Sequence, residues 1–257
     1  MLCSILISNF NKSKYIKRCL NSLYAQSYKN IEIIFSDNNS TDNSLEIASN
    51  YQNINIIKTE RVSNFPAINQ IDVINHAFQR SKGEFIFLLD ADDFFEKNKV
   101  ENVINFHKKY ASDFICDIPN LFFNKNKIHR FKTKSYFSFI RTWPIIFPTS
   151  AISFTKEFFK DFQKYLLVND FSKLEIDFRL NVFAFIENKK NFLLDDNLTF
   201  YNQTQDGIMS NYKKFDKNWW KKRMQAHQYF QKISDKKNFN YKKNIDYYFT
   251  SLINRFY

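Results

Sequence analysis

The sequence predicts an α/β protein with a mostly parallel central sheet flanked by helices, followed by a helical appendage. Three observations lead to this prediction. Short apolar segments alternate with amphipathic segments of helical spacing over the first ninety residues. One apolar segment, 85–89, runs directly into three carboxylates. From residue 215 onward, the chain has the helical, basic and aromatic pattern of an appendage.

The first half of the chain reads as repeated strand–helix units. Strands are expected where short runs are apolar and rich in β-branched or aromatic residues, at 2–8, 31–35, 54–58 and 85–90. Helices are expected where apolar residues recur every three or four positions, at 14–26, 43–50, 65–80 and 97–110. This alternation is typical of βαβ units, so the carboxyl ends of these strands should share one edge of the sheet.

The second half mixes shorter elements. Strands are expected at 114–118, 121–131 with a turn at 124–126, 150–154, 192–194 and 198–201. Helices are expected at 134–142, 156–167 and 174–187, before the helical end of the chain.

Acidic residues follow the strand expected at 85–90. The segment Asp90-Ala91-Asp92-Asp93 lies where open α/β sheets bind ligands, at the carboxyl end of a strand. Carboxylates this close repel one another, and Mg²⁺ is typically held by one or two carboxylates together with substrate phosphates. The pattern therefore suggests a divalent cation that also holds a phosphate. A solvated acidic turn is the alternative.

A second polar loop, Asp37-Asn38-Asn39-Ser40-Thr41-Asp42, follows the strand expected at 31–35. Asp37 can accept a hydrogen bond from a nucleobase N–H, whereas Ser40 and Asp42 suit capping of the next helix. Two carboxylate loops on one edge of a sheet suggest a nucleoside-diphosphate site. A simple capping loop remains the alternative for Asp37.

The order and spacing of these motifs resemble the family 2 glycosyltransferases of GT-A fold, of the inverting, non-processive bacterial type. The resemblance runs from Ile5 to about Tyr201. The matching segments are Ser8-Asn9-Phe10-Asn11 for a P-x-Y-N turn, 26–34 for Q-T/S-Y-x-N-x-E-I-I, 37–42 for D-D/N-G-S-x-D, and Asn75 with Ser81-Lys82-Gly83-Glu84 ahead of the acidic strand end.

The resemblance implies a Rossmann-like GT-A domain at 1–205 and a helical C-terminal extension at 206–257. Within the domain, 1–117 would bind the nucleotide sugar and 118–205 the acceptor. The implied activity moves one sugar from a nucleotide sugar, expected to be UDP-linked, to a hydroxyl of a glycan or lipid-linked acceptor. Cell-surface polysaccharide or lipooligosaccharide synthesis is the expected setting.

The resemblance also assigns roles to residues. Asp37 would contact a uracil-type base, and Asp90 the ribose or diphosphate. Asp92, with Asp90, would hold Mn²⁺ or Mg²⁺. The metal would neutralise charge that develops on the departing diphosphate. The full set of implied nucleotide-sugar contacts is Phe10, Asn11, Asp37, Asn75, Asp90, Ala91 and Asp92.

Inversion requires a general base that deprotonates the acceptor hydroxyl. The family supplies it from an E-D-x-x-L segment at a helix start, and Glu175-Ile176-Asp177-Phe178-Arg179-Leu180 occupies that place. Asp177 aligns best with the family's Asp. Ile176 interrupts the expected acidic pair, so Glu175 stays a rival. An ordinary acid near a helix N-terminus, favoured by the dipole, is the alternative for both.

The sequence departs from the family pattern in four ways. Ser8 stands for a proline and Asn39 for a glycine, but Asn tolerates positive φ, so the turn is expected to persist. No Q-x-x-R-W segment follows Asp177, and no stretch has transmembrane length. Single sugar transfer is therefore expected rather than processive synthesis.

Composition limits other classes of function. Gly83 and Gly207 are the only glycines among 257 residues, which excludes G-x-G-x-x-G and G-x-x-x-x-G-K-[ST] loops. Three isolated cysteines without zinc spacing suggest reduced structural thiols in a cytoplasmic protein. Residues 1–8 are too short for a signal peptide.

Two other functions are alternatives to glycosyl transfer. The formal charge of +12 could indicate a basic nucleic-acid-binding protein, but the motif loops are acidic, so no nucleic acid partner is expected. A nucleotidyltransferase acting on sugar phosphates would need a Gly-rich loop after the first strand, and 8–13 contains no glycine.

The basic aromatic segment 218–230 lies outside the resemblance. Helical spacing puts Trp220, Met224 and His227 on one face, which favours a helix packed on the core. Two functional interpretations stay open. One is peripheral contact with an anionic membrane surface near lipid-linked acceptors. The other is a phosphate or metal contact from Arg223 or His227, with His227 as the candidate metal ligand.

Overall fold

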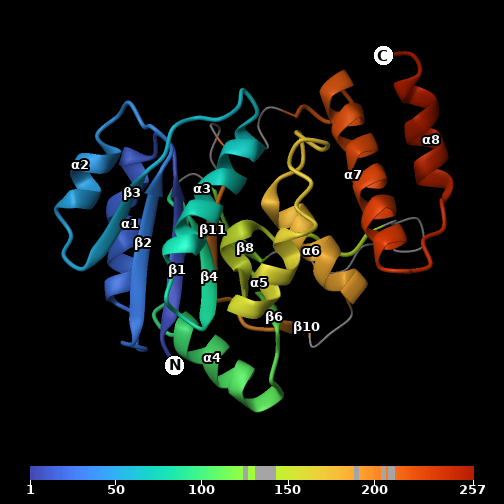
Figure 1. Cartoon of the computed structure of the whole chain (residues 1–257). Coiled ribbons are helices and arrows are strands. Elements are labelled where there is room, and N and C mark those ends of the chain that lie inside the picture. The colour runs from blue at the N-terminus through green and yellow to red at the C-terminus, as the bar shows by residue number, and fades with distance from the viewer. Residues whose placement is uncertain (124–126, 131–142, 188–190, 204–206, 208–211) are drawn as a thin grey trace.

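A computed structural model describes residues 1–123, 127–130, 143–187, 191–203, 207 and 212–257. Strands and helices alternate through the first half of the chain, as the sequence predicts (Figure 1). The strands are β1 (Cys3–Asn9), β2 (Ile31–Asp37), β3 (Ile54–Lys58), β4 (Phe85–Asp90), β5 (Phe94–Phe95), β6 (Phe114–Asp117), β7 (Asn120–Phe123), β8 (Lys127–Arg130), β9 (Ile152–Thr155), β10 (Asn191–Leu194) and β11 (Thr199–Asn202).

The helices cover the faces of the sheet or follow it in the chain. They are α1 (Ser13–Tyr24), α2 (Ser44–Ser49), α3 (Pro66–Arg80), α4 (Lys99–Tyr110), a 3₁₀ turn η1 (Thr149–Ala151), α5 (Lys156–Gln163), α6 (Ile176–Glu187), α7 (Lys217–Lys236) and α8 (Ile245–Asn254).

Seven strands form the central sheet in the order β10-β6-β9-β4-β1-β2-β3. Strands β3, β2, β1 and β4 are mutually parallel, and so are β6 and β10. Strand β9 runs antiparallel to both β4 and β6. The prediction of a mostly parallel sheet flanked by helices is therefore confirmed.

The register of the sheet brings the two polar loops together. Ser8 of β1 lies opposite Asp90 of β4, and Asn9 lies opposite Asp37 of β2. Because these strands are parallel, the loops that follow them leave the sheet at the same edge.

A second sheet has the strand order β5-β11-β7-β8. It begins directly after residues 90–93, here called the acidic loop. Strand β5 begins directly after Asp93 and pairs antiparallel with β11. The rings of Phe94 and Phe200 stack there, with 4.4 Å between their centroids. This pairing carries Tyr201 and Asn202 to the acidic loop although they lie far along the chain.

Apolar side chains cover both faces of the central sheet. One core joins the sheet to α1, α2 and α4, and the other joins it to α3, α5, α6 and α7. The second core is rich in phenylalanine. Phe159 stacks on Phe154 and also contacts Phe78, with ring centroids 5.1 and 4.5 Å apart. The cysteines are free and buried, as predicted.

Helices α7 and α8 lie side by side at the opposite end of the molecule from α2 (Figure 1). Asp216 caps α7 by accepting from Trp219 N at 2.6 Å, and Asn244 caps α8 by accepting from Tyr247 N at 3.1 Å. Within the described part of the chain, no helix combines the length and apolar composition that a membrane crossing requires.

Some element boundaries differ from the prediction. Helix α5 ends at Gln163 rather than at 167, and Leu167 has a positive φ of 47° that a helix cannot accommodate. The strand expected at 150–154 begins at Ile152, after η1. The helix expected at 134–142 and the turn at 124–126 lie outside the described residues. The domain boundaries at 117 and 205 stay predictions.

Candidate functional site

A pocket of about 720 Å³ opens at the carboxyl ends of β1 and β4. The turn after β1, the first half of α3, the acidic loop, the start of α6 and the end of β11 contribute to its walls. Its size suits a small-molecule ligand. Of the residues expected from the sequence, it is lined by Phe10, Asp90, Ala91, Asp92, Glu175 and Asp177.

The two pocket-facing acids of the loop have different partners. Asp90 Oδ1 accepts hydrogen bonds from Ser8 Oγ and from Gln70 Nε2, the latter at 2.9 Å. Asp92 Oδ2 lies 2.9 Å from Lys12 Nζ. Burial, followed by the charge of Asp92, raises the pKa of Asp90 to about 6.

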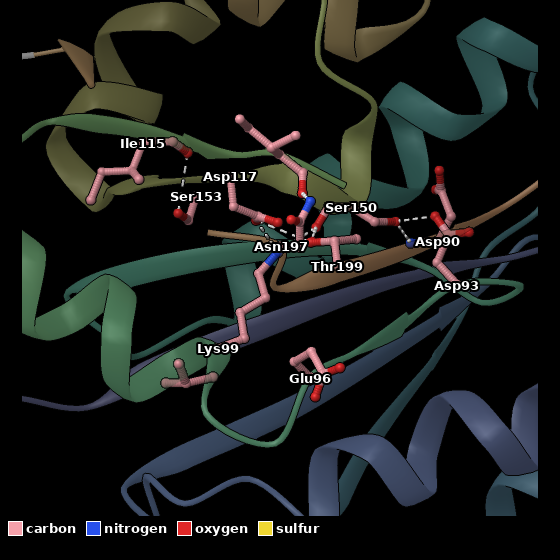
Figure 2. A network of polar contacts seen from close by, with 12 residues as sticks. Asp90, Asp93, Glu96, Lys99, Ile115, Asp117, Ser150, Ser153, Asn197 and Thr199 are labelled. Atoms are coloured by element: carbon pink, nitrogen blue, oxygen red, sulfur yellow. Dashed lines mark hydrogen bonds and ion pairs between the residues drawn. The ribbon is translucent and has the colours of Figure 1, made fainter. Parts of the chain in front are cut away.

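The third acid, Asp93, is buried in the protein and fixes the shape of the loop. Its Oδ1 accepts from Asn202 N at 2.7 Å, and its Oδ2 accepts from Ser150 Oγ. Ser150 Oγ also accepts from Asp90 N at 3.0 Å, so this hydroxyl links Asp90 to Asp93 (Figure 2). Burial raises the pKa of Asp93 well above its usual range.

A buried lysine, Lys99, links the segments next to the acidic loop. Lys99 Nζ donates to Asp117 Oδ1 and to Ser150 O, both at 2.7 Å, and to Thr199 Oγ1 (Figure 2). Burial lowers the pKa of Lys99 and raises that of Asp117. Removing one partner of a buried pair costs about 3–5 kcal/mol. The network therefore joins α4, β6, η1 and β11 rigidly under the acidic loop.

Asp37 holds its own loop together. It is fully buried, and its Oδ1 accepts from Asn9 Nδ2 and Ser40 Oγ, both at 2.6 Å. Its Oδ2 accepts from Ser40 N at 2.9 Å. Asn39 in this loop has φ of 57°, which confirms that Asn replaces glycine at a left-handed position. Asp37 is not among the residues that line the pocket.

Three residues that line the pocket each carry a buried side-chain carbonyl oxygen with no hydrogen-bond partner among the described residues. These residues are Asn9, Asn38 and Gln70. In each case the amide nitrogen is committed to an acceptor, such as Glu60 O for Asn38 at 3.2 Å, which fixes the orientation of the amide. An unsatisfied buried acceptor costs about 1–3 kcal/mol. A ligand donor that reached one of these oxygens would remove that cost.

The two candidate bases lie at the start of α6. Glu175 pairs with Lys222 of α7, whereas Asp177 Oδ1 accepts from Phe178 N at 2.6 Å. Burial, followed by the charge of Glu175, raises the pKa of Asp177 to about 7; the charge of Lys222 opposes this rise. The two acids therefore differ in their surroundings. Glu175 has a cationic partner, whereas the pKa of Asp177 lies near 7.

A buried arginine sets the position of Asp177. Arg179 donates to the carbonyl oxygens of Leu166, Phe171 and Leu174, the last at 3.1 Å. These carbonyls belong to the segment that enters α6, so one guanidinium fixes that segment against the first turn of the helix. Burial lowers the pKa of Arg179 to about 10.

Three residues expected at the site lie elsewhere. Asn11 Oδ1 accepts from Thr41 N at 2.8 Å and ties two loops together. Asn75 Oδ1 accepts from Gln163 Nε2 at 3.4 Å, on the α5 side of α3. His227 is fully buried, with Nε2 3.0 Å from Asp246 Oδ2. None of the three lines the pocket, and Arg223 also binds Asp246, so the structure does not support a metal or phosphate contact from α7.

The acids of the pocket fit a metal only in combination with a ligand. Among the described residues, no three His, Cys, Asp or Glu side chains are grouped to hold an ion. Asp90 and Asp92 supply a pair of carboxylates, and Mg²⁺ commonly binds through one or two carboxylates plus substrate phosphates. The pair therefore suits a cation that arrives with a diphosphate.

The sequence profile described as glycosyl transferase family 2 matches residues 4–172, about two thirds of the chain. This chain belongs to glycosyl transferase family 2. The match favours glycosyl transfer over the two alternatives, nucleotidyl transfer and nucleic acid binding.

This family 2 chain is similar in sequence to an Escherichia coli protein named UDP-Glc:alpha-D-GlcNAc-diphosphoundecaprenol beta-1,3-glucosyltransferase WfaP. It is 36% identical over 108 residues, which cover 41% of this chain and 41% of that protein. The matched segments span less than half of the length of the curated relatives.

Solved structures confirm the GT-A fold of this family 2 chain. Staphylococcus aureus TarS in complex with UDP-GlcNAc has a TM-score of 0.64 at 20% identity, covering 89% of this chain and 66% of that one. The Pyrobaculum calidifontis mannosyltransferase PcManGT, in complex with GDP-Man and Mn²⁺, has a TM-score of 0.61 at 15% identity, covering 91% of this chain and 64% of that one.

The sequence did not reveal several residues of the site. Lys12, Gln70 and Lys222 each bind one of the pocket acids, and Arg61 lies with Cζ 4.2 Å from the ring centroid of Phe10. Each is a common surface residue type without a motif. Only Lys12 carried a signal, since it directly follows the turn 8–11 at the end of β1.

Proposed function

We propose that the pocket transfers one sugar from a nucleotide sugar to a hydroxyl of a glycan or lipid-linked acceptor, with inversion at the sugar carbon. One observation carries the proposal. Asp177, whose pKa lies near neutrality, lines the same pocket as the strand-end acids Asp90 and Asp92. A carboxyl of that pKa is suited to take a proton near pH 7, and strand-end acids are suited to a cation and a diphosphate.

UDP is the proposed nucleotide. Asn38 Oδ1 can accept from N3–H of uracil, and its orientation is fixed by the bond from Nδ2 to Glu60 O. Phe10 offers a partly exposed ring beside the base, with Arg61 on it. Asp37 would act by holding Asn9 and Ser40. The UDP-sugar in the WfaP name and the UDP-GlcNAc bound to TarS support this choice.

Asp177 is the proposed general base, and Glu175 is proposed to tune it. Asp177 removes the proton from the acceptor hydroxyl while the acceptor oxygen bonds to the anomeric carbon. The bond from that carbon to the diphosphate oxygen breaks, and the nucleoside diphosphate leaves with the electron pair. Lys12, beside Asp92, places positive charge near the expected position of the diphosphate.

Asp92 and Asp90 would hold Mn²⁺ or Mg²⁺ together with the diphosphate. When bound, the metal supplies positive charge to the leaving group. The presence of Mn²⁺ in the PcManGT complex supports such a metal. Synthesis of a cell-surface polysaccharide or lipooligosaccharide is the proposed setting, supported by the diphosphoundecaprenol acceptor in the WfaP name.

A screen of UDP-, GDP- and ADP-sugars tests the proposal through thermal protection and slow hydrolysis with Mn²⁺ present. At least one UDP-sugar should raise Tm and be hydrolysed. Asp177→Asn should keep the protection and lose hydrolysis, whereas Glu157→Gln, at an exposed acid that pairs with Lys160 on α5, should keep both. Absence of protection by every nucleotide sugar would contradict the proposal.

A further inference from the structure

Helix α8 turns its apolar side chains toward solvent. Four residues of α8 at helical spacing, together with Phe256 just after the helix, form an exposed strip, here called the α8 stripe: Ile245, Tyr248, Phe249, Leu252 and Phe256. Their exposed fractions run from 51% to 80%. A helix that merely covers a core would place these residues inside. Single exposed apolar residues are ordinary, but a contiguous strip of this kind marks an interaction surface.

Polar side chains anchor the side of α8 that faces α7, where the rings of Tyr247 and His227 also lie 5.5 Å apart. Asp246 accepts from Arg223 Nε at 3.0 Å and from Arg223 Nη2 at 2.7 Å, and it also meets His227. Thr250 is fully buried, and Asn254 Nδ2 donates to Trp220 O at 3.1 Å. These three α8 residues, four positions apart, lie on one face. Polar contacts therefore anchor α8 to α7, while its most apolar face is exposed.

Aromatic contacts extend the α8 stripe onto α7. The ring of Phe249 lies 5.7 Å from that of Trp220, which lies 6.1 Å from that of Phe215. Phe215 is 59% exposed. The apolar surface thus reaches from α8 to the residue before the cap of α7.

Strong positive charge surrounds this surface. Residues 212–257 contain twelve Lys and Arg against three Asp, so this segment carries nine of the twelve net charges of the chain. Lys242 and Lys243 precede the stripe, and Arg255 follows Tyr248 by two helical turns on its border. Among the described residues of 212–257, the exposed charged residues are Lys213, Lys214, Lys217, Lys236, Lys242, Lys243 and Arg255, with Asp235 as the single acid.

We propose that the α8 stripe inserts into the interface of an anionic membrane. An apolar face bordered by Lys and Arg is the pattern of a helix that lies in the headgroup region, where apolar burial and attraction to anionic lipids add. Charge argues against a second copy of the chain, because pairing would bring two positive segments together. The interaction is separate from sugar transfer and is measured without any sugar substrate.

Co-sedimentation with vesicles tests the proposal on the full chain. The protein should bind phosphatidylglycerol vesicles, bind phosphatidylcholine vesicles much more weakly, and lose affinity as salt is raised. Leu252→Glu should weaken binding at least about tenfold, because it places a charge in the buried face. Leu193→Glu is the matched control: Leu193 is 44% exposed on β10, and its replacement should leave binding unchanged.

The outcomes that overturn the proposal are distinct. Failure of the wild-type protein to bind anionic vesicles at low salt would overturn it, and so would equal binding by Leu252→Glu and wild type. A dimer in solution that Leu252→Glu dissociates, without vesicle binding, would reassign the stripe to self-association. Circular dichroism of both variants establishes that each is folded, and UDP protection against melting, measured separately, reports on the pocket.

Discussion

Lys12 Nζ lies 2.9 Å from Asp92 Oδ2, and both side chains are only 14% exposed. A fixed positive charge thus occupies the neighbourhood of the carboxylate that is proposed to hold a divalent cation. The lysine and the metal would compete for the same oxygen, while the lysine also favours the diphosphate. Lys12 is therefore expected to have opposite effects on the two ligands.

Replacement of Lys12 should separate these effects. In Lys12→Met, which keeps the aliphatic stem, Mn²⁺ should bind several-fold more tightly in the presence of UDP. UDP binding in EDTA should become weaker, because the ammonium no longer attracts the diphosphate. Titration calorimetry with and without EDTA measures both. Lys14→Met removes the same charge from an exposed position on α1 and should change neither.

Two results would contradict this assignment. Mn²⁺ affinity that is the same in Lys12→Met and wild type would show that the ammonium does not compete for Asp92. Metal-dependent UDP binding that survives Asp92→Ala in a folded protein would remove Asp92 from the metal site.

The base pocket leads to a second prediction. UDP should bind more tightly than ADP, because Asn38 Oδ1 accepts from uracil N3–H, whereas the corresponding position of adenine is an acceptor. Asn38→Ala should weaken UDP binding about two- to tenfold, the equivalent of one neutral hydrogen bond, and affect ADP little. Calorimetry with the two nucleotides measures this. Equal affinities for UDP and ADP would exclude Asn38 and Asp37 from base recognition.

Asp37→Asn distinguishes a structural role in the loop from the direct base contact proposed for Asn38. Asp37 accepts three hydrogen bonds from Asn9 and Ser40, so its replacement should lower Tm as well as UDP affinity. A variant with normal Tm and lost uridine preference would return direct base contact to Asp37.

The sequence predicted the elements that depend on local pattern. Strand β4 and its acidic end were evident because five apolar residues run into Asp90, and Asn39 was identified as the left-handed residue of its loop. Both signals are short-range, since they depend on residues next to each other in the chain.

Residues whose contacts lie far away in the sequence were harder to predict. Lys99 lies near the start of the helix expected at 97–110, and no local pattern marks it as buried, yet Asp117, Ser150 and Thr199 contact it in the interior. Asn75 was assigned to the pocket by motif position, whereas Gln70, five residues earlier on the same helix, binds Asp90. Such assignments depend on strand order and helix rotation, which no single segment encodes.

The third prediction concerns Asp177 as a titrating group. Its pKa of about 7 in the folded protein lies above the ordinary value of 3.8 for an unfolded chain. Between these values the native state keeps a proton that the unfolded state gives up, so this group's contribution to stability falls as pH rises toward 7. Asp177→Asn removes that cost, and its gain in Tm over wild type should be larger at pH 8 than at pH 5. Thermal melts at both pH values measure it.

Activity should depend on the ionised form of the same carboxyl. The acidic limb of kcat/KM should have an apparent pKa near 7, so the wild-type rate should be roughly tenfold lower at pH 6 than on the plateau. Asp177→Asn should lower turnover by roughly 10²- to 10⁴-fold and abolish the limb. UDP affinity should barely change, because Asp177 is proposed to face the acceptor.

Glu175 and Lys222 should move this limb in opposite directions. The negative charge of Glu175 raises the pKa of Asp177, and the positive charge of Lys222 lowers it. Glu175→Gln should therefore shift the limb to lower pH with activity retained at pH 8, and Lys222→Met should shift it to higher pH. Other groups that act on Asp177, namely Asp90 and the Phe178 N–H, are the same in both variants. An inactive Glu175→Gln beside an active Asp177→Asn would transfer the role of base to Glu175, and full activity in both would place the base elsewhere in the chain.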